Sequence, residues 1–85
     1  FSISAPLPDS IESKDTVLVS GNSPSGSLVV IEGVADEVVV SANGDSKYAG
    51  KVTLSEGKNE IVVTSYMNGT PSRQSVIVFY TPEKF

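Results

Sequence analysis

The sequence predicts an all-β fold in which two layers of short antiparallel strands pack face to face. The first observation is composition, because Val, Ile and Thr fill the runs between turns and branched side chains suit a pleated surface. The second is the spacing of turn-forming residues, which recur at about every 8–12 positions, as in β-sandwiches. The third is the corner Glu56-Gly57-Lys58-Asn59, which lies between two runs of alternating apolar and polar residues.

About seven strands are expected, and turn signals separate them. Pro6 and Pro8 end the first strand, because neither residue can donate to a ladder. Gly, Asn and Pro indicate turns over the segments 21–26, 43–45 and 68–72, and the turn at 43–45 is expected to tolerate positive φ. The expected strands cover residues 1–4, 16–20, 27–32, 37–41, 47–54, 60–66 and 73–81.

Alternation also predicts which side chains face the core. The expected inward residues are Val17, Val19, Val52, Leu54, Ile61, Val63, Val76, Val78 and Tyr80. The last strand is apolar on both faces, so this assignment leaves Ile77 and Phe79 on its outer face. We favour cover by a loop or a neighbouring side chain. The alternative is contact with an adjoining domain or subunit, because exposed apolar patches often mark interfaces.

The length and the net charge of the chain limit its number of domains and the partners that it is expected to bind. The chain has 85 residues and a formal net charge of −4, which predicts a single domain spanning 1–85 and disfavours nucleic acid as a partner. No apolar stretch approaches the roughly 20 residues that span a bilayer, so no membrane insertion is expected. Because the chain opens at Phe1 without a visible signal peptide, we expect a piece of a longer multidomain protein.

Several short motifs resemble one family. Val19-Ser20-Gly21 is followed by Pro24-Ser25-Gly26, and the chain ends in an apolar strand over 76–82. Between them lies a pattern formed by Gly44, Tyr48, Val52, Leu54, Glu56, Gly57, Asn59, Ile61 and Val63. Over nearly its whole length the chain resembles bacterial immunoglobulin-like domains of the type known from accessory domain B of glucodextranase. The resemblance implies an immunoglobulin-like β-sandwich.

Three residues of this pattern have structural reasons of their own. Gly57 can adopt positive φ at the corner between two strands. Asn59 can hydrogen-bond backbone groups that lose their ladder partners there. Tyr48 is expected to bring its ring to the edge of the core while its hydroxyl stays near water.

The residues do not predict an enzyme. The sequence contains no His and no Cys, which rules out a Ser–His pair and Cys chemistry. Other bases can activate Ser, but no Ser lies in a recognisable catalytic motif, and no cofactor is expected. Calcium binding is a minority hypothesis. Its support is that Asp9, Glu12 and Asp15 cluster before one strand, while residues 36–37 form an acidic pair before another. We favour solvated surface acids and expect no metal site.

Ligand or interface contacts are expected, if anywhere, at Tyr66, Asn68, Ile77 and Phe79. Aromatic faces beside polar groups suit carbohydrate, although packing at the ends of the sandwich is the reading we favour for both aromatic residues. If the protein passes through a glycosylating secretory route, Asn68-Gly69-Thr70 is an acceptor sequon for N-glycosylation. In a bacterial protein the same residues form only a turn, which is the interpretation we favour.

The function predicted from these observations is that of a non-catalytic spacer or accessory module in a secreted or cell-surface protein, with neighbouring domains of the same chain as partners. The alternative is an adhesion module that binds a glycan or a surface protein through end loops or the outer face of the last strand. Fold alone cannot distinguish these two functions.

Overall fold

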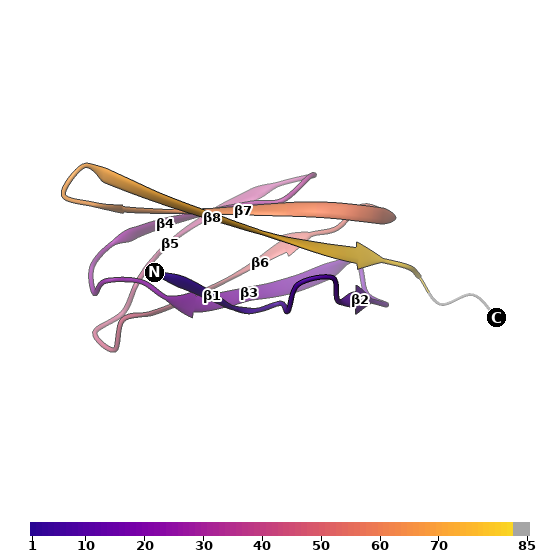
Figure 1. Cartoon of the computed structure of the whole chain (residues 1–85), viewed down its shortest axis with the longest axis horizontal. Coiled ribbons are helices and arrows are strands. Elements are labelled where there is room, and N and C mark those ends of the chain that lie inside the picture. Colours follow the sequence, from indigo (N-terminus) through magenta and orange to yellow (C-terminus); the bar gives the residue numbers. More distant parts are fainter. Residues whose placement is uncertain (83–85) are drawn as a thin grey trace.

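A computed structural model describes residues 1–82, which form β-strands and no helix (Figure 1). The strands are β1 (Ser2–Ala5), β2 (Ile11–Glu12), β3 (Thr16–Asn22), β4 (Leu28–Glu32), β5 (Glu37–Ser41), β6 (Lys47–Thr53), β7 (Gly57–Met67) and β8 (Thr70–Tyr80). Each of the seven expected strands is present, and β2 adds an eighth. Two residues are too short for alternation to reveal a strand.

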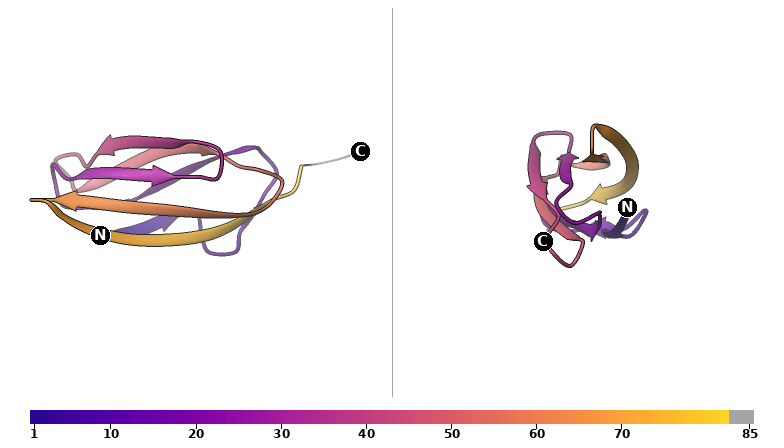
Figure 2. Two further views of the ribbon diagram at one scale, coloured as in Figure 1. Left: turned by 90° about the horizontal axis from the view of Figure 1, so that it is seen from above. Right: turned by 90° about the vertical axis from the view of Figure 1, so that its left-hand side faces the viewer.

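The strands form two sheets that pack as a sandwich. The smaller sheet has the order β1-β3-β6 and the larger has the order β2-β8-β7-β4-β5. The two layers and the crossings between them are visible in the end-on view of Figure 2. All strand pairs are antiparallel except β2 with β8, so the prediction of a purely antiparallel fold is wrong at this one edge.

The core lies between the sheets and contains the expected side chains. Its buried members are Val17, Val19, Val29, Ile31, Tyr48, Val52, Leu54, Ile61, Val63, Val76 and Val78, with Tyr80 partly buried against them. The inward assignment made from alternation is therefore confirmed. Gly50 allows the sheets to approach, because a Cβ there would come within 2.8 Å of Ile31 Cδ1.

The hairpin of β7 and β8 is longer than expected, because its turn is tighter. Met67 pairs with Thr70, which leaves only Asn68 and Gly69 in the loop, with φ of 52° and 77°. Two consecutive positive φ values are the mark of a type I′ turn. The next pair puts Pro71 opposite Tyr66; the nitrogen of Pro71 then points away from β7, where a missing donor is tolerated.

The corner between β6 and β7 confirms two sequence expectations. Gly57 has a φ of 95°. Asn59 is fully buried, and its amide donates to the carbonyl oxygens of Ser55 and Gly57 at 2.9 and 3.0 Å while accepting from the Ser55 N–H at 2.8 Å. The side chain of Asn59 thus replaces the ladder partners that these backbone groups lose at the bend.

Candidate functional site

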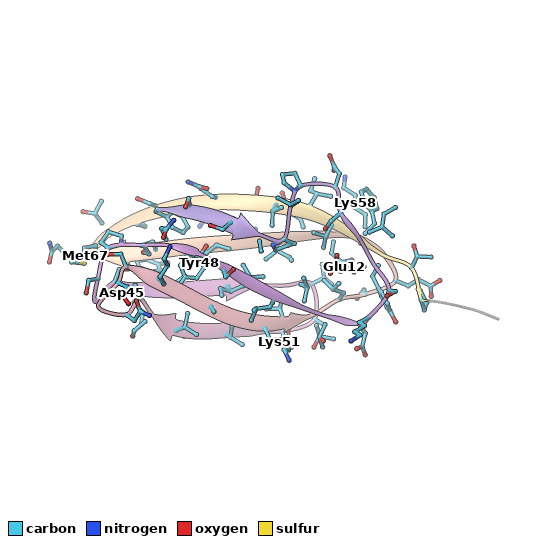
Figure 3. All side chains as sticks on the ribbon, turned by 90° about the horizontal axis from the view of Figure 1, so that it is seen from below. Glu12, Asp45, Tyr48, Lys51, Lys58 and Met67 are labelled. Atoms are coloured by element: carbon cyan, nitrogen blue, oxygen red, sulfur yellow. The ribbon has the colours of Figure 1, made fainter. Side chains whose placement is uncertain are left out.

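The residues expected to make ligand contacts lie in two separate regions of one hairpin. Tyr66 pairs with Pro71, and Phe79 pairs with Lys58. Pro71 and Phe79 are eight positions apart on β8, which corresponds to about 27 Å along a strand. Figure 3 shows the two ends of the molecule, with Met67 at one and Lys58 at the other. No single ligand of sugar size can touch both aromatic rings.

At the turn end of the hairpin, apolar side chains share the outer face of the larger sheet. Tyr66 lies opposite Leu28, and the two are 41% and 46% exposed. Asn68 is exposed at the adjoining turn. This arrangement combines an aromatic face with a polar loop, which are the elements of a shallow binding surface.

At the other end, Ile77 and Phe79 are half-buried, and the segment around β2 runs along the edge of their strand. The Asp9 N–H donates to the Ile77 carbonyl at 2.7 Å, and the Phe79 N–H donates to the Ser10 carbonyl at 2.9 Å. Ile11 lies opposite Phe79 and is 75% exposed. The outer face at this end is therefore apolar but narrow.

Tyr48 contradicts the expectation of a hydroxyl near water. Its side chain is 3% exposed, and its hydroxyl donates to the Ser2 carbonyl oxygen at 2.9 Å. Burial raises the pKa of Tyr48 to about 12, because the charged phenolate loses its hydration. The ring also lies 6.1 Å from that of Phe1. Tyr48 thus fastens β1 to the sandwich.

The acidic residues considered for calcium do not come together. No group of three or more His, Cys, Asp or Glu side chains that could hold a metal ion occurs among residues 1–82. Asp36 instead accepts hydrogen bonds from the Thr53 N–H at 2.9 Å and the Thr53 hydroxyl at 2.8 Å. These bonds cap the end of β6.

A buried hydroxyl cluster was not anticipated from the sequence, where its serines are typical of turns. Ser23 Oγ lies 2.6 Å from Ser27 Oγ and 2.7 Å from Ser65 Oγ, and each of the three residues is at most 3% exposed. The sequence contains no His to activate a serine, and the burial of the cluster keeps substrates away. The cluster ties the loop between β3 and β4 to β7.

A shallow depression lies where the chain crosses between the sheets near β2. Its volume is about 410 Å³, and its lining includes Pro6, Leu7, Ser10, Glu12 and Leu18. The Ser10 hydroxyl is buried without a hydrogen-bond partner among the described residues. One carboxylate and the hydroxyl groups of Ser10 and Thr16 are too few polar groups to define a reaction.

Comparison with known proteins finds no family model that matches the chain and no curated protein that matches it. No helix in the described part of the chain could span a bilayer.

Proposed function

We propose that this chain is a non-catalytic immunoglobulin-like spacer or accessory module of a secreted or cell-surface protein, with neighbouring domains as its partners. The observation that carries the proposal is the placement of the two ends. Phe1 lies toward the turn end of the β7–β8 hairpin, whereas the chain leaves β8 at the other end (Figure 1). The sandwich is elongated, with extents of 48 × 20 × 18 Å.

Both ends are also attached firmly to the sandwich. At the first end, Phe1 accepts a hydrogen bond from the Gln74 side chain at 2.8 Å, and Tyr48 binds the next carbonyl. At the second, the Thr81 N–H donates to the Glu12 carbonyl at 2.9 Å. Neighbouring domains joined to such ends would be held at a set separation, which is the property that a spacer requires.

The spacer function can be tested by measuring how rigidly the two ends are held. The chain has no native Cys, so Ser4→Cys with Thr81→Cys places two spin labels at exposed positions near the ends. We expect pulsed electron spin resonance to give one narrow distance distribution. The reference is Leu18→Cys with Lys58→Cys, two exposed positions within strands β3 and β7. A distribution for the ends that is clearly broader than the reference would contradict a rigid spacer.

The alternative function is adhesion, and the exposed pair of Tyr66 and Leu28 favours the turn end of the hairpin as the binding surface. A glycan and surface-protein array should then detect binding that Tyr66→Ala removes and that Phe79→Ala, at the far end of the hairpin, leaves unchanged. Loss of binding with Phe79→Ala alone would move the surface to the other end. If no binding is detected on the array, the result favours the spacer function.

A further inference from the structure

We propose that the free edge of β5 is a self-association surface, at which a second copy of this chain adds its own β5 antiparallel about a two-fold axis at Val39. The larger sheet would then continue from one copy into the other. Such a dimer would form whether or not the chain acts as a spacer.

The backbone N–H and C=O groups of alternate residues along β5 point in opposite directions. Two hydrogen bonds mark the hydrogen-bonded pairs at the two ends of the β4–β5 hairpin. One runs from the Gly33 N–H to the Asp36 carbonyl, and the other runs from the Ala42 N–H to the Ser27 carbonyl. Such pairs alternate with non-bonded ones along an antiparallel ladder. Val38 and Val40 therefore bond to β4, whereas the N–H and C=O groups of Glu37, Val39 and Ser41 point to the free edge.

The other three sheet edges within residues 1–82 have features that discourage strand pairing, and the β5 edge lacks them. On the β6 edge, Asp36 caps Thr53, and the Asn43 side chain accepts from the Lys47 N–H at 3.0 Å. The β1 edge has an irregular register between Ile3 and Ala5, and β2 has only two residues. Short strands, irregularities and capping side chains all discourage pairing. The strand β5, with the sequence EVVVS, has no proline, lysine or bulge.

The position of Glu37 at one end of β5 limits the registers in which two copies can pair. With Val39 opposite Val39 of the second copy, each Glu37 lies opposite a Ser41, whose hydroxyl can donate to the carboxylate. A slip that centres the axis on Glu37 would place two carboxylates opposite each other, which is destabilising. Glu37 already faces Glu32 across the β4–β5 hairpin, so this slip would bring four carboxylates into one row. Charge therefore disfavours the register centred on Glu37, whereas the register centred on Val39 pairs each Glu37 with a hydroxyl group.

The pairing would cover apolar side chains on the outer face of the larger sheet. Val39 is 56% exposed and lies opposite Val30 on the outer face of the larger sheet. In the proposed dimer the Val39 side chains of the two copies lie next to each other. Part of the apolar surface of each side chain is then removed from water, which favours association. Because residues 1–82 of each copy present one such edge, the assembly closes at two chains.

The register can be tested by disulfide trapping. In a hydrogen-bonded antiparallel pair the two Cα atoms are about 5.5 Å apart, within the range that a disulfide spans. Val39→Cys should therefore form a covalent dimer on mild oxidation. Ser41→Cys is the matched control, because it is exposed on the same edge but would lie about 14 Å from its counterpart. We expect at least tenfold more dimer from Val39→Cys; no covalent dimer, or equal yields, would overturn the proposal.

The edge itself can be tested by sedimentation equilibrium of the unmodified chain, whose mass is 8.9 kDa. We expect the apparent mass to rise toward twice this value with concentration. Val39→Pro removes a donor that faces the free edge, and Val39→Lys adds a charge there while keeping the backbone intact. At least one of the two must fold, as judged by circular dichroism, and remain monomeric. An unmodified chain that stays monomeric, forms open-ended assemblies, or associates no more strongly than a folded variant would overturn the proposal.

Discussion

Gly21 on β3 lies directly opposite Tyr48 on β6, and the absence of a side chain at residue 21 makes the Tyr48 hydrogen bond possible. A Cβ at residue 21 would come within 2.8 Å of the Tyr48 hydroxyl oxygen and would collide with the Ser2 carbonyl oxygen. These are the two atoms that the hydrogen bond joins. The glycine, the tyrosine and the first strand therefore act as one unit.

Gly21→Ala should destabilise the chain, because the added methyl group must push β1 or the tyrosine ring away. We expect a loss of about 1–3 kcal/mol in the free energy of unfolding, the usual range for overpacking, measured by urea denaturation. Gly44→Ala is the control, since a Cβ there meets nothing within 4 Å, and it should change stability by less than about 0.5 kcal/mol. Equal effects of the two substitutions would contradict this account.

Alkaline pH should weaken the attachment of β1. The pKa of Tyr48 is about 12 in the folded chain and about 10 when unfolded. The stabilisation is therefore fully present below pH 10 and is lost as the pH rises toward 12. Other groups titrate in this range, so the quantity to measure is the difference in unfolding free energy between the unmodified chain and Tyr48→Phe. This difference should shrink between pH 9 and 12; a constant difference would refute the prediction.

Asn59→Ala should be among the most destabilising polar substitutions, because three hydrogen bonds at a buried corner are lost together. We expect a loss of about 2–4 kcal/mol in unfolding free energy, measured by thermal or urea unfolding. Asn59→Asp separates the two roles of the amide, because a carboxylate can accept from the Ser55 N–H but cannot donate to the two carbonyl groups. Asn22→Ala, at an exposed position, is the control and should have a much smaller effect.

Ser23→Ala should destabilise the chain by about 1–3 kcal/mol, because the hydroxyl groups of Ser27 and Ser65 lose their shared partner inside the protein. Ser25→Ala changes a serine of the same loop that is exposed, and it should be nearly neutral. Chemical denaturation of both variants measures the difference. If the two substitutions were equally mild, the hydroxyl cluster would contribute nothing to stability.

Alternation in the sequence located the strands and the core because strand period and burial are properties of neighbouring residues. Val52, Leu54, Ile61 and Val63 could be assigned inward without knowledge of any partner strand. The short strand β2 could not be found in this way, since its pairing with β8 joins residues far apart in the chain. The hydroxyl of Tyr48 was misplaced for the same reason, because its acceptor is the carbonyl of Ser2.

The candidate site depended more heavily on long-range structure. Tyr66 and Phe79 were both correctly placed on the β7–β8 hairpin, but only the register of that hairpin shows that they lie at opposite ends. The serines of the buried cluster looked like solvent-facing turn residues, and folding removed them from water. Their burial depends on how the loop between β3 and β4 lies against β7.

The sequence by itself determined that this chain is built from strands, where most of them lie and which side chains fill the interior, because those properties follow from local periodicity and turn chemistry. The tertiary structure alone decided the sheet order, the fastening of β1 by Tyr48 and the free edge of β5. These depend on which distant backbone groups meet, and hydrogen-bond direction is set only once two strands are side by side.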